Sequence, residues 1–335
     1  MLRVGIIGAG QVAARHAEAY AANPTATLVA VVDADVQRAK SLAARYDART
    51  HESYEELFAA GAVDAVSVCV PHDLHLPVTL AAARHGVHLL MEKPIANTLA
   101  EADEMIAAVE RAGLTMMIGF VHRFRTEVLE AKRIVDEGVL GPIATAVDKF
   151  CSLGGPHPPP WVWRKAQAGG GVLMYGGIHA IDRLLWLIGE PVVSVFARSH
   201  NYTGYGDVED GLVAMLEFAN GATGVLFENS PPYGRPGGWS TELFGPNGAV
   251  RIRTGEYVEL TATRQRFTLR AQDEQHFERE IDEFVAAVSE GRKPSVPAAA
   301  GRAALEIAVA VYESAAAGSP VIVGPRDHIE SGGGV

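Results

Sequence analysis

The sequence has few cysteines, no long apolar run and no excess of basic residues. Cys69 and Cys151 are the only cysteines among 335 residues, and Cys69 lies in an apolar stretch. We therefore expect two free thiols in a reducing compartment rather than a disulfide framework. No apolar run approaches the ~18 residues that a membrane span needs. The formal net charge of -11 argues against nucleic acid or an anionic membrane as a partner.

The N-terminal stretch MLRVGIIGAG lacks the features of a secretory signal. It enters a strand-like pattern almost at once, with no apolar h-region and no small-residue cleavage site. The histidines are scattered and show no ligand spacing typical of zinc. We therefore expect a cytoplasmic protein without a metal centre or a membrane segment.

The first third of the chain alternates between short β-branched runs and alanine-rich stretches with helical spacing. Strands that are apolar on both faces and separated by helices are typical of a parallel sheet covered on both sides. We therefore predict a doubly wound α/β domain. The predicted strands are 2–7, 28–32, 65–70, 87–91 and 115–118, and the predicted helices are 11–22, 36–44, 76–85 and 99–112.

The pattern changes after about Gly119, where strands and turns become dominant. Asn220-Gly221 lies between two apolar runs and is a strong hairpin signal. Helices on both sides of a strand-rich region favour an α+β domain with a mostly antiparallel sheet and helices on one face. The predicted helices are 126–137, 178–188, 275–289 and 298–316, the strand region is 192–269, and a loop rich in glycine, proline and tryptophan covers 152–171.

The hexapeptide GAGQVA follows the first predicted strand and opens the first predicted helix. It fits the pattern G-x-G-x-x-A, in which Gly8 permits a tight turn, Gly10 lets the backbone approach a pyrophosphate, and Ala13 permits close packing of helix on strand. Gln11 and Val12 lie at the helix N-terminus, which favours negative charge. Motif and context together predict dinucleotide binding, and a purely structural turn is the alternative.

Asp33 ends the second predicted strand, in LVAVVDAD. Its carboxylate can accept hydrogen bonds from both ribose hydroxyls of an adenosine and would repel a 2′-phosphate. We therefore expect NAD rather than NADP. Arg38 keeps NADP open as an alternative, because a flexible arginine can meet a phosphate.

The length of the chain favours two domains, at roughly 150 residues per domain. We expect a dinucleotide-binding domain over 1–121 and a substrate-binding and oligomerisation domain over 122–325. The remaining residues, 326–335, contain SGGGV and read as a flexible tail.

The stretch LLMEKPIA places two charged residues at the end of a buried strand. Ligands of a doubly wound sheet lie outside the carboxyl ends of its strands, and Glu92-Lys93-Pro94 occupies one of those ends. Lys93 can then donate to a substrate hydroxyl and favour the alkoxide that develops when hydride leaves. Glu92 can keep the ammonium charged. The alternative is an ion-paired surface lysine.

Several segments, taken in order, resemble the Gfo/Idh/MocA oxidoreductases, a family that includes glucose–fructose oxidoreductase and inositol dehydrogenases. The resemblance covers nearly the whole chain, and the order of the segments makes it specific. The segments are GAGQVA at 8–13, PHDLH at 71–75, MEKPIA at 91–96 with its E-K-P signature, WRKAQAGGGVLMYGGIHAID at 163–182 with a glycine run and G-x-H-x-x-D, VEDGLVAMLEFANGATG at 208–224, and YESAAAGSPV at 312–321.

This resemblance implies a Rossmann domain followed by a domain with a large, open-faced, mostly antiparallel sheet. A nicotinamide would lie between them, and the substrate would be a sugar, a polyol or a related alcohol. Lys93 matches the family's catalytic lysine, and its bond to Pro94 is expected to be cis. Pro71, His75 and Glu92 would lie beside the cofactor.

His179 matches the histidine of G-x-H-x-x-D, and the resemblance implies that it is the general base. An unperturbed pKa of about 6.5 suits that role, and a satisfied core histidine is the alternative. Many family members carry an aspartate four residues earlier, where this chain has Tyr175. If the helix starts that early, the two side chains share a face. Tyrosine can donate to substrate or stack on a sugar, but Asp182 is the candidate for the missing negative charge.

Other residues are candidates for binding the substrate. Arg123 follows the last Rossmann strand, and Trp163 and Arg164 resemble the W-R that precedes the family's glycine run. Trp161 and Trp163 can stack on sugar faces or can simply pack a proline-rich loop. His72 is expected beside the nicotinamide by the same resemblance.

The leading hypothesis is an NAD(P)-dependent oxidoreductase that acts on a secondary alcohol or ketone of a sugar or polyol. The alternatives are a glycosidase that oxidises its substrate transiently with tightly held NAD, and a regulator that only binds the dinucleotide. Lys93 and His179 together argue against the regulator. The runs 212–218 and 223–227 are apolar at alternating positions on both faces, which predicts a homodimer or homotetramer through the second sheet.

Overall fold

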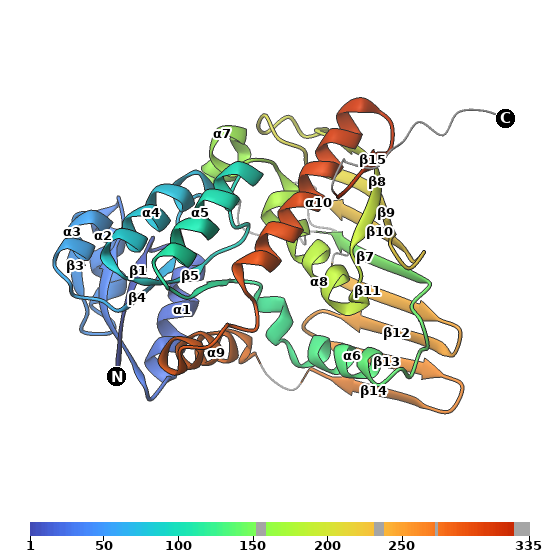
Figure 1. The fold of residues 1–335 in the computed structure, drawn as a ribbon, viewed down its shortest axis with the longest axis horizontal. Coiled ribbons are helices and arrows are strands. Elements are labelled where there is room, and N and C mark those ends of the chain that lie inside the picture. The colour runs from blue at the N-terminus through green and yellow to red at the C-terminus, as the bar shows by residue number, and fades with distance from the viewer. Residues whose placement is uncertain (152–158, 231–237, 272–273, 325–335) are drawn as a thin grey trace.

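A computed structural model describes residues 1–151, 159–230, 238–271 and 274–324. Figure 1 shows two sheets side by side, with the sheet formed by the first third of the chain on the left and the second sheet on the right. The flexible tail expected over 326–335 lies outside the described residues, as do residues 152–158 of the loop expected over 152–171.

The first sheet has six parallel strands in the order β3-β2-β1-β4-β5-β6. Helices cover it on both faces, so the doubly wound α/β prediction is confirmed (Figure 1). The strands are β1 (Leu2–Ile7), β2 (Ala26–Val32), β3 (Arg49–His51), β4 (Ala65–Val68), β5 (His88–Met91) and β6 (Met116–Ile118). The helices are α1 (Gln11–Ala22), α2 (Val36–Ala43), α3 (Tyr54–Ala59), α4 (His75–His85) and α5 (Leu99–Arg111).

The sequence pattern did not predict β3 or α3. β3 has only three residues, Arg-Thr-His, which are exposed or half-buried, so no apolar period marks it. α3 is one and a half turns long, and its clearest signal is the N-cap, where Ser53 accepts a hydrogen bond from the Glu56 amide at 3.1 Å. Short edge elements of this kind depend on pairing with the sheet rather than on their own composition.

The second sheet has nine strands in the order β14-β13-β12-β11-β7-β10-β9-β8-β15. β7 pairs with β10 in parallel, and the other neighbouring strands pair antiparallel. The prediction of a mostly antiparallel sheet is therefore confirmed. The strands are β7 (Thr145–Cys151), β8 (Val192–His200), β9 (Gly211–Phe218), β10 (Thr223–Asn229), β11 (Gly238–Gly245), β12 (Gly248–Arg253), β13 (Tyr257–Ala262), β14 (Arg266–Arg270) and β15 (Val321–Ile322).

Helices lie over one face of this second sheet (Figure 1). They are α6 (Thr126–Asp136), α8 (Ile178–Ile188) and α10 (Ala298–Ala317), and the short α7 (Lys165–Ala168) precedes α8. β9 shows the consequence, because its buried residues alternate with exposed ones such as Val213 and Met215. The opposite face of the sheet therefore carries exposed apolar side chains.

The C-terminal helices return to the first domain. α9 (His276–Glu290) packs against α1, and Asn23 Nδ2 donates to Asp282 Oδ1 at 2.7 Å across that contact. α10 packs against α5 and against β6, and at the β6 contact a Cβ at Gly301 would lie only 2.9 Å from Ile118. Glycine at 301 is therefore needed for this close approach.

Residues Lys165–Ile188 form a helical stretch that is long and apolar enough to cross a membrane by length and composition alone. The prediction from the sequence did not single it out, because the stretch is interrupted by charged residues and glycines. Of its most apolar window, 78% is buried inside the protein. Such burial is typical of the core helix of a globular domain.

Candidate active site

A cleft of about 260 Å³ lies at the carboxyl ends of the parallel strands, close to the point between β1 and β4 where the strand order reverses. Ligands of doubly wound folds bind at this position. The lining residues come from both domains. They are Gly10, Gln11, Val12, Cys69, Val70, His72, Glu92, Lys93, Val121, Pro159, Trp161, Tyr175, His179 and Phe277.

The glycine loop has the conformation that its sequence predicts. Gly8 has φ of +94°, and a Cβ there would lie 2.2 Å from the Cys69 carbonyl oxygen, so no other residue fits. Gly10 is the N-cap of α1, and no described side chain caps this helix. A Cβ at Gly10 would meet nothing within 4 Å. The first amides of α1 therefore face open space, which suits an anion.

Asp33 lies at the end of β2, beside the glycine loop. Its Oδ2 accepts from the Ala9 amide at 2.6 Å, and its Oδ1 accepts from the Asp35 amide at 2.7 Å. The exposed Arg38 lies beside it, with Nη2 3.2 Å from Asp33 Oδ1 and Nε 3.3 Å from Asp35 Oδ2. The carboxylate thus braces the glycine loop, and Arg38 is already paired with two acids.

Glu92 and Lys93 follow β5, and the Lys93–Pro94 bond is cis, as expected. Buried Glu92 has Oε1 3.2 Å from Nε2 of His16, which is on α1. Burial acts to raise the pKa of Glu92, but His16 and Lys93 outweigh it, so the pKa lies below its ordinary value. Glu92 is therefore an ionised neighbour for Lys93.

Lys93 projects from the first domain toward the second. Its Nζ donates to the Tyr175 carbonyl oxygen at 2.7 Å and lies 5.2 Å from the centre of the Tyr175 ring. Burial lowers the pKa of Lys93, and the carboxylate of Glu92 opposes that shift. The ammonium is thereby held at the boundary between the two domains, inside the cleft.

Tyr175 lies in a π-helical turn, Leu173–Gly177, that precedes α8. The α-helix itself starts at Ile178, so Tyr175 and His179 do not share the regular α-helical face that an early helix start would give. Both line the same cleft, and Tyr175 is 40% exposed there. The two residues therefore lie in the same cleft, but not on one face of a regular α-helix, and Tyr175 is held there by its contact with Lys93.

His179 is buried in a stack of aromatic rings. Its ring lies 4.2 Å from that of His122 with an interplanar angle of 14°, and Trp239 and Phe120 meet it edge-on at 6.0 and 5.9 Å. Arg183 Nη2 donates to His122 Nδ1 at 2.6 Å. His122 therefore carries its own proton on Nε2 when neutral.

The surroundings of His179 favour its neutral form. Burial lowers the pKa of His179 well below its ordinary value, and the cationic groups of Lys93, Arg183 and Arg125 add to that shift. Its Nδ1 is buried and has no hydrogen-bond partner among the described residues. A neutral imidazole at neutral pH is the form that a general base requires.

Arg123 and Asp182 are not among the residues that line the cleft. They pair with one another, with Arg123 Nε 2.9 Å and Nη2 2.5 Å from the two Asp182 oxygens, and the guanidinium lies over Trp186. Both line a separate hollow beside α8 and α10. The idea that Asp182 supplies a negative charge to His179 is therefore wrong for this geometry, because Arg123 takes up that carboxylate.

The tryptophan loop also differs from expectation. Trp161 lines the cleft, with its ring 4.8 Å from that of His72. Trp163 is directed instead toward Tyr205, with ring centres 5.9 Å apart, and Arg164 Nη1 is 3.5 Å from Gln167 Oε1. Pro160–Trp163 forms a 3-10 turn with about three residues per turn, so side chains two positions apart point in different directions, and Trp161 rather than Trp163 faces the cleft.

Pro71 and His75 lie beneath the loop that carries Lys93. Pro71 begins a 3-10 turn, and His75 is completely buried. Nδ1 of His75 is 3.0 Å from the Pro94 carbonyl oxygen, and Nε2 is 3.2 Å from that of Val70. Burial lowers the pKa of His75, and the contacts of its ring with these carbonyl oxygens brace the loop, so the ring does not line the cleft.

Sequence reasoning left several lining residues out of the expected site. Cys69 and Val70 follow β4, so the rule that ligands lie at strand ends could have found them. Phe277 comes from α9, almost at the far end of the chain, and no local signal marks it. Among the residues that the structure describes, no group of three or more His, Cys, Asp or Glu side chains is placed to hold a metal ion.

The fold and cleft define the chain as a dinucleotide-binding oxidoreductase. Open amides at α1, the carboxylate of Asp33 at the end of β2, and a lysine and a neutral histidine in one cleft fit a nicotinamide cofactor and an alcohol. The chain belongs to the Gfo/Idh/MocA family. Residues 2–120 match the oxidoreductase family model with an NAD-binding Rossmann fold, and 128–251 match the GFO/IDH/MocA C-terminal domain.

Individual relatives agree with this membership. D-glucoside 3-dehydrogenase of Escherichia coli is 36% identical over 68% of this chain and 69% of its own length. The structure of aldose–aldose oxidoreductase from Caulobacter crescentus complexed with glycerol is 30% identical, with a TM-score of 0.87 over 96% of this chain and 99% of that one. A levoglucosan dehydrogenase in complex with NADH and levoglucosan is 25% identical, with a TM-score of 0.87 over 96% and 99%.

The position of Asp33 predicts a preference between cofactors. NADH should bind more tightly than NADPH, by about tenfold or more, because a 2′-phosphate would face a carboxylate that is already hydrogen-bonded to the backbone. Asp33→Ser should reduce this difference in affinity, because it removes the carboxylate and frees Arg38 from its ion pair with Asp33. Fluorescence titration of both reduced cofactors measures this, and equal or tighter binding of NADPH by the unmodified protein would contradict it.

The environment of His179 predicts the pH dependence of alcohol oxidation. If His179 is the general base, activity requires its neutral form, so kcat/KM should fall as the pH drops through its lowered pKa, with the acidic limb below about 6.5. Tyr175→Asp should move this limb to higher pH, because a carboxylate in the cleft stabilises the imidazolium. Tyr175→Phe is the matched control and should leave the limb in place. A limb above 6.5 in the unmodified enzyme would refute the assignment.

Proposed function

We propose that this protein oxidises a secondary alcohol of a sugar, a polyol or a related compound, or reduces the corresponding ketone, with NAD as cofactor. One observation carries the proposal: Lys93 and His179, from different domains, line one cleft beside the N-terminus of α1. The names of the relatives, which act on a glucoside, an aldose and levoglucosan, support the substrate class.

In this mechanism His179 takes the proton of the substrate hydroxyl. It suits the role because its pKa is held well below the ordinary value, so the neutral ring is available at neutral pH. Stacking on His122 keeps the orientation of the ring constant while the proton is transferred. When bound, the nicotinamide supplies the acceptor for hydride.

Lys93 stabilises the negative charge that develops on the substrate oxygen. Its ammonium lies in the cleft and is held by the Tyr175 carbonyl, and the ionised Glu92 beside it favours the charged form. Preorganised positive charge at the point where an alkoxide develops is usually the largest contribution to such a reaction. Tyr175 completes this part of the cleft with its ring.

We assign different tasks to different parts of the chain. Residues 1–121 bind the dinucleotide, and 122–325 bind the substrate and associate with a second copy. Gly8, Gly10, Gln11, Val12, Ala13 and Asp33 hold the cofactor. The two free cysteines favour a cytoplasmic location.

A substrate panel with Lys93→Ala tests the function. Sugars, inositols and their keto forms should give a change in absorbance at 340 nm with NAD or NADH. Lys93→Ala should lower turnover by about 10²–10⁴ while the affinity for NADH stays within a few fold, since the lysine acts on the reacting oxygen. Arg133→Ala, on the exposed side of α6, is the control and should keep full activity.

An enzyme that keeps its turnover after Lys93→Ala has its chemistry elsewhere. Hydrolysis of a glycoside without net formation of NADH would instead identify the glycosidase alternative, in which the cofactor is regenerated on the protein. Binding of NADH without any turnover of the panel would favour the regulator.

The exposed face of the second sheet supports association with a second copy. The register places Phe196, Met215 and Val225 in one row across β8, β9 and β10, and Val213 and Phe227 in the next. Val213 and Met215 are 42% and 52% exposed. Apolar patches of this kind are normally covered.

Light scattering at micromolar concentration should therefore give the mass of a dimer or tetramer. Met215→Glu should shift the distribution toward the monomer, because it buries a charge in the interface. Leu129→Glu is the matched control, since Leu129 is 40% exposed on α6, on the other side of the sheet. A monomeric unmodified protein would refute the proposal.

A further inference from the structure

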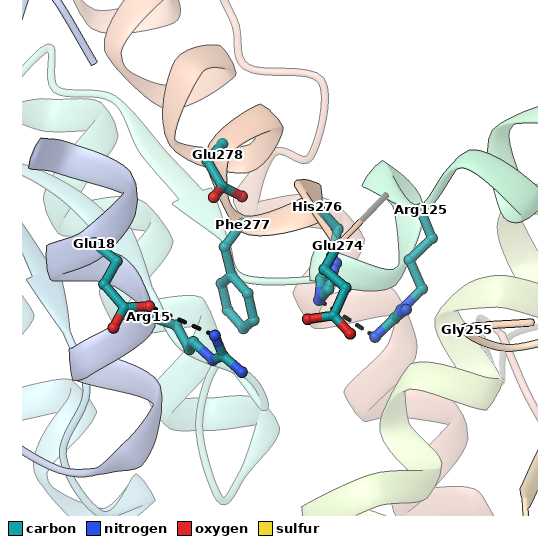
Figure 2. Close-up of a pocket in the computed structure, with 8 residues that line it drawn as sticks. All are labelled: Arg15, Glu18, Arg125, Gly255, Glu274, His276, Phe277 and Glu278. Carbon is teal, nitrogen blue, oxygen red and sulfur yellow. Dashed lines mark hydrogen bonds and ion pairs between the residues drawn. The ribbon is translucent and has the colours of Figure 1, made fainter. Parts of the chain in front are cut away.

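A second hollow, of about 410 Å³, adjoins the active cleft. Figure 2 shows that its walls come from α1 on one side and from the start of α9 and the segment before α6 on the other. Its volume falls in the range of small-molecule pockets, roughly 300–1,000 Å³. The lining residues are Arg15, Glu18, Arg125, Gly255, Glu274, His276, Phe277 and Glu278.

Phe277 connects this hollow to the active cleft, because it lines both. Its ring stands between Arg15 and Glu274 in Figure 2 and packs against His16, with ring centres 5.7 Å apart. Along α1, Gln11 lines the cleft and Arg15 lines the hollow, and residues four apart share a helix face. The hollow is therefore the continuation of the cleft along α1, away from the glycine loop.

The chemistry of the lining favours a neutral ligand with many hydroxyl groups. Arg15 and Arg125 are donors, and Glu18, Glu274 and Glu278 are acceptors, so carboxylates outnumber guanidiniums and an anion is disfavoured. Arg125 Nη2 lies 3.3 Å from His276 Nε2, and Arg125 Nε is buried without a hydrogen-bond partner among the described residues. Hydroxyl groups both donate and accept, and the ring of Phe277 offers an apolar surface to a sugar face.

The residues expected to hold the cofactor do not line this hollow. Asp33 lies at the end of β2, and Gly10, Gln11 and Val12 line the active cleft instead. The hollow is thus available to the part of a substrate that extends beyond the reacting ring.

We propose that this hollow binds a second sugar ring or another hydroxyl-rich aglycone, so that the substrate is a glycoside or disaccharide whose oxidised ring lies in the cleft. This inference rests on the proposed oxidation of a sugar alcohol. It adds that recognition extends past Phe277 to Arg15 and Glu274.

A series of related substrates tests the proposal. The free sugar found by the panel is compared with its methyl glycoside and its disaccharide; for glucose these are D-glucose, methyl β-D-glucoside and cellobiose. kcat/KM should rise by about tenfold or more from the free sugar to the disaccharide, mainly through a lower KM, because hydrogen bonds to charged groups are added. Calorimetry with the NADH-loaded protein measures binding of the same compounds without turnover.

The double variant Arg15→Ala/Glu274→Ala locates the effect. It should raise KM and Kd for the disaccharide by about tenfold and leave both within twofold for the free sugar. The matched control is Arg133→Ala/Glu137→Ala, which removes an exposed ion pair of the same residue types on α6 and should change neither.

The outcomes separate this inference from the proposed function. Equal kcat/KM for free sugar and disaccharide, or equal losses for both in the double variant, would overturn the second subsite while the oxidoreductase function stands. If no compound is oxidised, the proposed function fails, and calorimetry still decides the subsite. Disaccharide binding that the double variant weakens supports the subsite, and absence of binding refutes it.

Discussion

The buried guanidinium of Arg183 is the constraint on which the geometry around His179 depends. A charge that is 1% exposed is stable only while its partners remain in place. Those partners come from separate parts of the chain: Asp148 on β7 at 3.7 Å, Thr241 on β11 at 2.7 Å and His122 in the turn that leaves the first domain. Because His122 is held in this way, the His179 ring that stacks on it is held as well.

The two groups proposed to react with the substrate have opposite charged neighbours. Lys93 belongs to the first domain and has the ionised Glu92 beside it, which in turn contacts His16 on α1. His179 belongs to the second domain and is buried near cations, so its pKa is low. Environments that separate the pKa values of two groups assign their roles as proton acceptor and charged stabiliser. The cleft between the domains therefore brings the lysine with its carboxylate neighbour together with the histidine and its cationic neighbours.

Several features could be predicted because they depend on residues close together in sequence. The doubly wound sheet follows from apolar periodicity, and the loop at Gly8 follows from a turn that only glycine tolerates. Lys93 was found because parallel strands bring their carboxyl ends to one edge. β3 was missed since three polar residues carry no period, and the direction of Trp161 could not be read from a loop whose geometry depends on the domains that it joins.

The sequence by itself determined the two kinds of sheet and the glycine loop, and it pointed to the lysine and the histidine that we propose as the reactive pair, because those signals are periodic or lie within a few residues of each other. Only the tertiary structure decided which charges meet. Arg123 and Asp182 pair across 59 positions, and Arg183 and His122 across 61. Phe277 reaches the cleft because α9 packs back on α1. Such contacts depend on how helices cross, and a one-dimensional pattern does not encode the crossing.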